Sequence, residues 1–174
     1  MADFAHAIAV TLRMEGGYVD SPHDRGGATN HGISQRYAEK KLGRHVSDDE
    51  MRELSVDQAI EWYREDFWLP IYDRIRSQVV ATKIFDIGVN CGPGSACRIL
   101  QRALNCLLFS PMLTVDGNFG EITLAAVDDT DPQQLIETLI YEQIEHYKRI
   151  VESDPAQQPN MAAWRIRAQW PLRG

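Results

Sequence analysis

Residues 15–34 interrupt the helical pattern of the sequence, and they constrain the fold more than any other stretch. They follow an amphipathic run over residues 3–14, whose apolar residues recur at the spacing of one buried helix face. The stretch then carries two glycine pairs and Gly32, and glycine permits positive φ angles and close approach of another backbone segment. We therefore expect a helix that ends at Glu15, followed by a short β-hairpin or loop packed against a cleft.

Helical spacing of apolar residues continues through most of the chain after this stretch. Residues that can cap a helix precede these apolar faces, namely Ser34, Ser47, Ser55 and Asp131. A cluster of helix breakers at residues 90–94 ends one of the predicted helices. The pattern predicts a mainly α-helical fold with at most one small β-hairpin, near residues 17–33. The expected helices cover residues 35–42, 47–54, 56–69, 78–89, 95–104, 121–128 and 132–151.

The charge and hydropathy of the chain argue against two classes of partner. The 174 residues carry a formal net charge of −7, with a pI near 5.2. Such a chain lacks the concentrated basic surface that binding to nucleic-acid phosphates requires. No apolar run approaches the ~20 residues that a membrane-spanning helix needs. We therefore expect neither nucleic-acid binding nor membrane insertion.

The first residues and the cysteines indicate where the protein is made. Residues 1–6 lack the basic region and the long apolar region of a secretory signal peptide. The cysteines are odd in number and form no CxxC pair, so we expect buried or partly buried free thiols at Cys91, Cys97 and Cys106. These features predict synthesis in the cytoplasm without a signal peptide.

Glu15, Asp24 and Thr29 form the candidate catalytic set. Hydrolysis of a glycosidic bond needs a carboxylic acid that protonates the leaving oxygen, and a carboxylate or an activated water at the anomeric carbon. A carboxylate at the C-terminal end of a helix meets the negative end of the helix dipole, which opposes ionisation and suits a general acid. A loop that doubles back after the first glycine pair can bring Asp24 opposite Glu15, with Thr29 close enough to orient a water. A carboxyl separation of ~5 Å would favour a retaining path, and ~6.5–9.5 Å an inverting one.

Five further residues are candidates for substrate binding. Trp68 lies in the most aromatic part of the sequence, where we expect most rings in the core and this one stacked on a sugar. Asp86 and Asn90 lie four residues apart on one helix face. There they serve either as a surface pair and a helix cap or as groups beside the cleft. Tyr18 and His31 belong to the glycine-rich stretch, where we expect them to pack or hydrogen-bond near the cleft rather than take part in the chemistry.

Several segments carry a resemblance to a known family. Residues 15–18, 22–29 and 32–34 resemble the signature of glycoside hydrolase family 108, the muramidases that include phage endolysins and secretion activator proteins. Residues 85–92 and 100–104 are also similar to that family. The resemblance implies a lysozyme-like fold, a helical bundle with a small β-hairpin lobe over the active-site cleft. It also implies cleavage of the bond between N-acetylmuramic acid and N-acetylglucosamine in peptidoglycan, with Glu15 as general acid and without a metal or other cofactor.

A second resemblance lies further along the chain. Residues 115–123 are similar to the Asp-Gly-x-x-Gly-x-x-Thr turn of small helical peptidoglycan-binding modules. The resemblance implies a lysozyme-like catalytic region over residues 1–90 and a peptidoglycan-binding-like region over residues 91–174 packed on it. It implies bacterial peptidoglycan as the partner. We expect a monomer that acts on the cell wall, in the periplasm, after release by a separate factor.

Two other interpretations of the same residues stay open. His23, Asp24 and His31 are a possible zinc set for a peptidoglycan amidase or peptidase, although no HExxH pairing occurs and zinc ligands usually come from rigid elements. The chain could instead bind the wall without catalysis, with residues 91–170 supplying the affinity. Loss of activity on chelation would favour the zinc site. Equal clearing of cell walls by the wild type and by Glu15→Gln would remove Glu15 from the mechanism.

Overall fold

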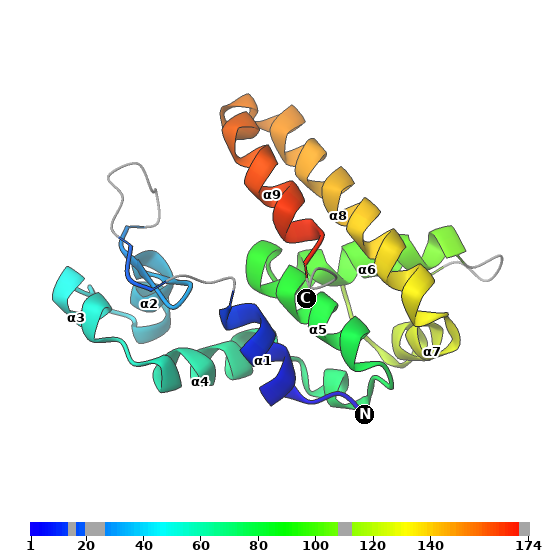
Figure 1. The fold of residues 1–174 in the computed structure, drawn as a ribbon, viewed down its shortest axis with the longest axis horizontal. Coiled ribbons are helices and arrows are strands. Elements are labelled where there is room, and N and C mark those ends of the chain that lie inside the picture. The colour runs from blue at the N-terminus through cyan, green and yellow to red at the C-terminus, as the bar shows by residue number, and fades with distance from the viewer. Residues whose placement is uncertain (14–16, 20–26, 108–112, 171–174) are drawn as a thin grey trace.

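The structure, a computed structural model, describes residues 1–13, 17–19, 27–107 and 113–170. Helix dominates these residues (Figure 1), which confirms the predicted mainly α-helical fold. The α-helices are α1 (Phe4–Leu12), α2 (Gln35–Leu42), α3 (Asp48–Glu53), α4 (Val56–Phe67), α5 (Gln78–Cys91), α6 (Pro93–Leu107), α7 (Glu121–Asp129), α8 (Pro132–Ser153) and α9 (Met161–Ala168). Two 3-10 helices, η1 (Pro70–Arg74) and η2 (Pro155–Asn160), join α4 to α5 and α8 to α9.

Helix α5 is the centre of the molecule. Its residues from Val80 to Gly88 are all buried, and it packs against α1, α4, α6 and α8 (Figure 1). One hydrophobic core runs from Ala2 near the N-terminus to Leu139 in α8. A smaller cluster of Tyr147, Met161 and Ala168 joins α8 to α9. The two regions expected from the sequence therefore share one core.

The helices begin where the capping residues predict. The side chain of Ser34 accepts a hydrogen bond from the amide of Tyr37, and that of Ser55 from the amide of Gln58. Asp131 caps α8 in the same way, with Pro132 at its first turn. Each cap satisfies an amide that has no partner within its own helix. These contacts confirm the predicted starts of α2, α4 and α8.

The predicted β-hairpin consists of β1 (Thr29–Asn30) and β2 (Ile33–Ser34), which pair antiparallel. His31 and Gly32 form the two-residue turn, with φ of 49° and 77°. Two consecutive positive φ angles are the geometry of a type I′ turn, in which glycine is favoured and other residues are uncommon. The hairpin is therefore tight.

Two hydrogen bonds fix the hairpin to the helices that follow it. The buried Asn30 donates through Nδ2 to the carbonyl of Met51 (2.9 Å), at the end of α3. Tyr63 of α4 donates through its hydroxyl to the carbonyl of His31 (3.1 Å). The hairpin, α2 and α3 form one unit, which we call the hairpin lobe, at one side of the molecule (Figure 1).

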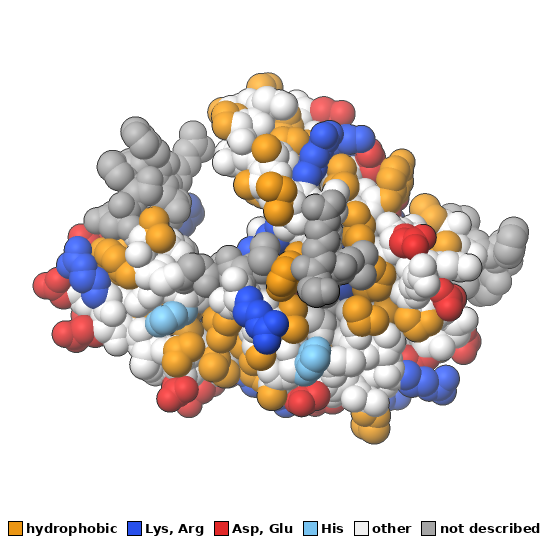
Figure 2. Space-filling view, in the orientation of Figure 1, with side chains coloured by type: hydrophobic (Ala, Val, Ile, Leu, Met, Phe, Trp, Pro, Cys, Tyr) orange, Lys and Arg blue, Asp and Glu red, His pale blue; other side chains and the backbone are white. Residues whose placement is uncertain are grey.

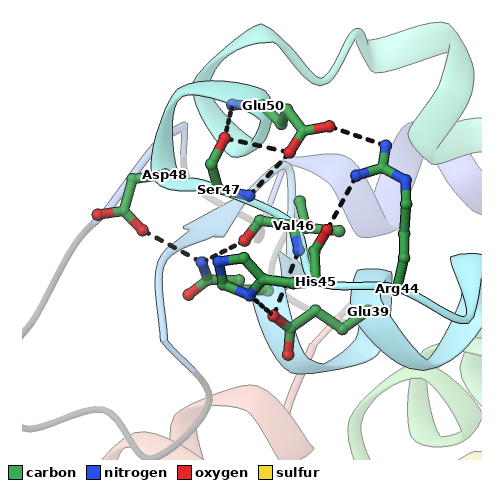
Figure 3. Close-up of polar contacts among 8 residues, drawn as sticks. Glu39, Arg44, His45, Val46, Ser47, Asp48 and Glu50 are labelled. Carbon is green, nitrogen blue, oxygen red and sulfur yellow. Dashed lines mark hydrogen bonds and ion pairs between the residues drawn. The ribbon is translucent and has the colours of Figure 1, made fainter.

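A polar network holds α2 and α3 of the hairpin lobe together (Figure 3). Ser47 and Glu50 form a reciprocal capping box at the start of α3. Arg44 pairs with Glu50 (2.8 Å) and is the largest contribution that lowers the pKa of Glu50, to about 2. The carboxylate of Glu39 accepts from the amide of Val46 and lies 2.6 Å from Nδ1 of His45. The connection between the two helices is thus held at both ends.

All three cysteines are free, as predicted, but Cys106 is exposed rather than buried or partly buried. No helix in the described part of the chain combines the length and the apolar character that a membrane span requires.

Candidate functional site

Two of the three candidate catalytic residues, Glu15 and Asp24, lie outside the described residues. The structure describes residues on both sides of Glu15 and of Asp24, and these flanking residues outline the candidate site. Helix α1 ends at Leu12 with Arg13 as its cap. Further along, Val19 and Thr29 exchange both backbone hydrogen bonds, each of 2.8 Å. The segment that contains Asp24 therefore starts and ends at one β-bridge.

Thr29, Tyr18 and His31 all belong to this frame. Thr29 is half-buried in β1 and lies opposite Ser34. The ring of Tyr18 is half-buried and carries the guanidinium of Arg52 over its face, 4.8 Å from the centroid. His31 is half-buried at the hairpin turn. The structure thus brings these three predicted residues to the hairpin lobe.

Figure 2 shows a hollow in the face of the molecule between the hairpin lobe and α9. Basic side chains are visible at the floor of this hollow. In the same view of the ribbon, α1 and α5 lie at its base and α9 runs down toward them (Figure 1). A cleft between a hairpin lobe and a helical body is the arrangement that the resemblance to lysozyme-like enzymes implies.

Trp68 does not line this hollow, contrary to the prediction from the sequence. It is 3% exposed, and its ring makes edge contacts with Phe4, Tyr72 and Phe85. Its indole nitrogen donates to Asp73 (2.7 Å). Both faces of the ring are covered by protein, so a sugar cannot stack on it without displacing the core.

Asp86 is also completely buried. It accepts a hydrogen bond from the guanidinium of Arg167 in α9 (3.0 Å), whose side chain is itself only 15% exposed. The carboxylate of Asp86 therefore faces the C-terminal helix from within the core. This buried geometry argues against the contact between Asp86 and substrate that we expected from the sequence.

Asn90 lies on the same face of α5, one turn further on. Its side-chain oxygen accepts from the hydroxyl of Tyr147 in α8 (2.7 Å), which in turn accepts from Gln143 (2.6 Å). The ring of Tyr147 stacks on Trp164 of α9, with centroids 5.0 Å apart. Asn90 thus joins α5 to both C-terminal helices, and it is half-buried.

The sequence analysis missed Lys83, which is fully buried in α5. Its ammonium group donates to the carbonyls of Ala168 (2.6 Å) and Trp170 (2.9 Å). Burial is the main cause that lowers its pKa, to about 8. A single cation within the apolar run of residues 80–87 was the available signal, because lysine is rarely buried without a specific partner.

The turn at residues 115–120 is held to α6 by Gln101. The side chain of Gln101 donates to Asp116 (2.8 Å) and accepts from the amide of Gly117 (2.9 Å). Asp116 also accepts from the amide of Asn118, and these hydrogen bonds lower the pKa of its carboxyl. The turn borders a pocket that Leu113 and the exposed Ile122 also line. Asp116, Gly117 and Asn118 of the motif therefore hold the turn in place against α6.

The possible zinc set lies mostly outside the described residues. Of the possible zinc set, only His31 lies in the described part of the chain. Over residues 1–13, 17–19, 27–107 and 113–170, no three His, Cys, Asp or Glu side chains come together as ligands.

Comparison with known proteins agrees with this arrangement. Residues 8–92 match the family described as Glycosyl hydrolase 108, and residues 95–169 match the family described as Predicted Peptidoglycan domain. The solved structure of SagA from Brucella abortus has 30% sequence identity and a TM-score of 0.74, over 98% of this chain and 96% of that one. No curated protein sequence matches the chain. The chain therefore belongs to the glycosyl hydrolase 108 family and is a lysozyme-like glycoside hydrolase directed at peptidoglycan.

Proposed function

We propose that this enzyme is a muramidase, which hydrolyses the bond between N-acetylmuramic acid and N-acetylglucosamine in peptidoglycan. The observation that carries the proposal is the hollow between the hairpin lobe and α9, with the end of α1 at its base and Thr29 in the lobe (Figures 1 and 2). Residues 8–92, the segment that matches the hydrolase family, contain Glu15, Asp24 and Thr29.

In the proposed reaction, Glu15 is the general acid. It gives its proton to the bridging oxygen, the glycosidic bond breaks, and a water adds to the anomeric carbon. The position of Glu15 in the sequence favours the role of general acid. A carboxyl group that follows the C-terminal end of α1 meets the negative end of the helix dipole, which opposes its ionisation. Asp24 or Thr29 orients the water, which keeps one proton in the new hydroxyl group and gives the other to the carboxylate of Asp24 or of Glu15. An ionised Asp24 beside a protonated Glu15 is the division of roles that such carboxyl pairs use.

The proposal also covers the C-terminal region and the place of action. Residues 91–174 would hold the glycan strand against the catalytic region of residues 1–90. The substrate lies in the cell wall, so the enzyme would act in the periplasm, after release from the cytoplasm by a separate factor.

A turbidity assay on purified cell walls tests the role of Glu15. We expect the wild type to clear the suspension and Glu15→Gln to be slower by several orders of magnitude, because the variant has no proton to give. The matched control is Glu53→Gln, an exposed glutamate of α3 in the hairpin lobe, which should clear the walls like the wild type.

Other outcomes of the same assay identify the alternatives. Equal clearing by the wild type and Glu15→Gln would exclude Glu15 from the mechanism, and loss of clearing after chelation would favour the zinc-dependent reaction. Sedimentation of the protein with walls that it never clears would indicate a non-catalytic binder. A smaller loss in Asp24→Asn than in Glu15→Gln is expected if Thr29 positions the water, and equal losses would make Asp24 the base or the nucleophile.

A further inference from the structure

A pocket of about 600 Å³ lies where the turn of residues 115–120 meets the start of α7. We call it the α7 pocket. Residues of the segment 113–123 line it, together with Gln101 of α6. Its volume is typical of a pocket that binds a small molecule or part of a larger one. Helix α7 and the hairpin lobe lie at opposite sides of the molecule (Figure 1).

The lining of the α7 pocket is fixed to α6. Gln101 holds the turn through Asp116 and Gly117, as described above. Asn105 holds Leu113 with two hydrogen bonds, one to its carbonyl (2.8 Å) and one from its amide (2.7 Å). The pocket is therefore built in advance, which lowers the cost of ordering it when a ligand binds.

The start of α7 supplies hydrogen-bond donors to the pocket. Its N-cap is Gly120, which has no side chain to cap the helix. The amide of Leu124 donates the first hydrogen bond of the helix, to the carbonyl of Gly120 (2.9 Å). The amides of Glu121, Ile122 and Thr123 precede it, and no described residue accepts from them. These amides can therefore donate to a ligand.

Thr123 points to a ligand independently of the helix end. It is only 4% exposed, yet its hydroxyl makes no hydrogen bond to any residue that the structure describes. The hydroxyl oxygen is not enclosed in the core either, so it opens onto the α7 pocket, which Thr123 lines. A polar group at so buried a position is normally hydrogen-bonded, which favours a ligand atom as its partner.

The charges around the α7 pocket favour a neutral ligand. Asp116 and Glu121 line it, and hydrogen bonds lower the pKa of both carboxyls, from Asn118 and Gln101 to Asp116 and from Arg74 to Glu121. These two carboxylates repel a ligand that carries a free carboxylate. The positive end of the α7 dipole and the guanidinium of Arg74 oppose a cation. A neutral group that both accepts and donates hydrogen bonds fits best.

We propose that the α7 pocket binds the acetamido group of an N-acetylated sugar in the glycan strand. The acetamido carbonyl accepts from the amides of α7 and from the hydroxyl of Thr123, and the acetamido N–H donates to Asp116. The methyl group packs against Leu113 and Ile122, which is 76% exposed at the pocket. This inference rests on the proposed function, in which residues 91–174 hold the glycan strand.

The test titrates the full chain with N-acetylglucosamine and follows the backbone amides by heteronuclear NMR. This sugar contains no glycosidic bond, so the result does not depend on hydrolysis. We expect saturable shifts of the amides of residues 120–123. Glucose and glucosamine, which lack the acetyl group, should give none there, and neither should D-alanyl-D-alanine, which carries a free carboxylate. Equal saturation by glucose, saturation by the dipeptide instead of the sugar, or no saturation at all would overturn the inference.

Thr123→Val tests the hydrogen bonds to the ligand. The variant loses a hydroxyl that has no partner among the described residues, so it should fold and bind N-acetylglucosamine about fivefold more weakly, the effect of one lost hydrogen bond. The matched control is Thr138→Val in α8, whose hydroxyl donates to the carbonyl of Gln134 in its own helix (2.9 Å). The control should bind like the wild type. Equal affinities of the two variants would contradict the proposed contact.

Ile122→Ser tests the apolar contact. Ile122 is exposed, so its substitution should leave the fold intact and weaken binding by a factor of about three, because part of the methyl contact is lost. Ile166→Ser, at a similarly exposed isoleucine of α9, is the matched control and should not change the affinity. An Ile122→Ser variant that binds like this control would exclude the methyl contact.

Clearing of cell walls, measured separately, distinguishes this inference from the proposed function. A protein that clears walls but shows no shift at residues 120–123 overturns the role of the α7 pocket and leaves the muramidase proposal intact. A protein that binds N-acetylglucosamine there but releases no glycan ends supports the α7 pocket and contradicts the proposed hydrolysis.

Discussion

Gly27, at the entry to the hairpin, shows how single residues set the geometry of the lobe. Its φ is +75°, and a Cβ added there would lie 2.3 Å from Oε1 of Gln35. That side chain cannot move away without loss, because its amide nitrogen donates to the carbonyl of Val46 (2.7 Å) and to Asp48 (3.2 Å). Only glycine fits at this position.

Gly27→Ala is therefore expected to destabilise the protein more than Gly43→Ala. Gly43 has a similar φ of +68° but open space around its Cα, so its substitution measures the backbone strain alone, about 1 kcal/mol. The steric conflict with Gln35 should add about 1–3 kcal/mol in Gly27→Ala. Urea denaturation of both variants gives the difference, and equal losses of unfolding free energy would contradict the packing described for Gln35.

Lys83 predicts a pH dependence of stability. Burial lowers its pKa from 10.5 in the unfolded chain to about 8 in the folded protein. Between these values the unfolded state holds more protons than the folded state, so the free energy of unfolding rises with pH. Below about pH 8 both states are protonated and this contribution is constant.

The matched comparison is the wild type against Lys83→Met, which cannot titrate at this position. The difference in unfolding free energy, wild type minus variant, should be level below pH 8 and rise toward pH 10.5. Denaturant titrations at several pH values measure it. A difference that stays level or falls over this range would contradict the lowered pKa of the buried Lys83.

Among the side chains, the sequence predicted some environments and not others. The side-chain caps at Ser34, Ser55 and Asp131 follow from local spacing, because the two partners of each cap lie within one turn. The burial of Trp68 and the pairing of Asp86 with Arg167 depend on contacts between residues far apart in the chain. Helical spacing placed Asp86 and Asn90 on one face correctly, but the neighbours of that face come from α8 and α9, which local patterns do not reveal.

At the scale of elements, Asn30 joins the hairpin to α3. Its side-chain amide, 4% exposed, donates to the carbonyls of Met51 (2.9 Å), Arg52 (3.3 Å) and Leu54 (3.4 Å). These groups include carbonyls left without partners at the end of α3. The position of Thr29 in β1 therefore depends on a helix that follows it by about 20 residues.

We expect Asn30→Ala to cost about 1–3 kcal/mol of unfolding free energy, because buried carbonyls lose their donor. Asn30→Asp should cost more, because a buried carboxylate would face carbonyl oxygens instead of donating to them. Thermal denaturation at neutral and acidic pH measures the stability of both variants. The cost of the aspartate should shrink at acidic pH, where its protonated form donates. An aspartate variant as stable as the alanine variant would contradict this contact.

Element boundaries were predictable where caps mark them and less so elsewhere. The starts of α2, α4 and α8 follow their Ser or Asp caps. Helix α6 begins at Pro93 rather than at Ser95, because proline is accepted in the first turn of a helix. Helix α9 is not among the helices predicted from the sequence, because its short run of residues has no strong apolar period.

At the scale of the whole molecule, the two family segments share one hydrophobic core. Leu100 and Leu104 of α6 and Leu135 and Leu139 of α8 are fully buried in the same core as α1 and α5. Removing the C-terminal segment would expose the faces of α5 that these side chains cover.

A fragment of residues 1–92 should therefore not fold alone, although it spans the region that matches the hydrolase family. The full chain should unfold in one cooperative transition, with the same midpoint by tryptophan fluorescence and by far-UV circular dichroism. A fragment with its own cooperative transition would contradict the shared core. The sequence indicated two regions but not their common core, since that core arises from packing between distant helices.

The most direct test of the proposed function is mass spectrometry of peptidoglycan digested by the wild type and by Glu15→Gln. A muramidase that uses Glu15 as its acid should produce new reducing ends on N-acetylmuramic acid with the wild type and almost none with the variant. New reducing ends on N-acetylglucosamine, stem peptides released from the glycan, or equal products from both proteins would contradict that account.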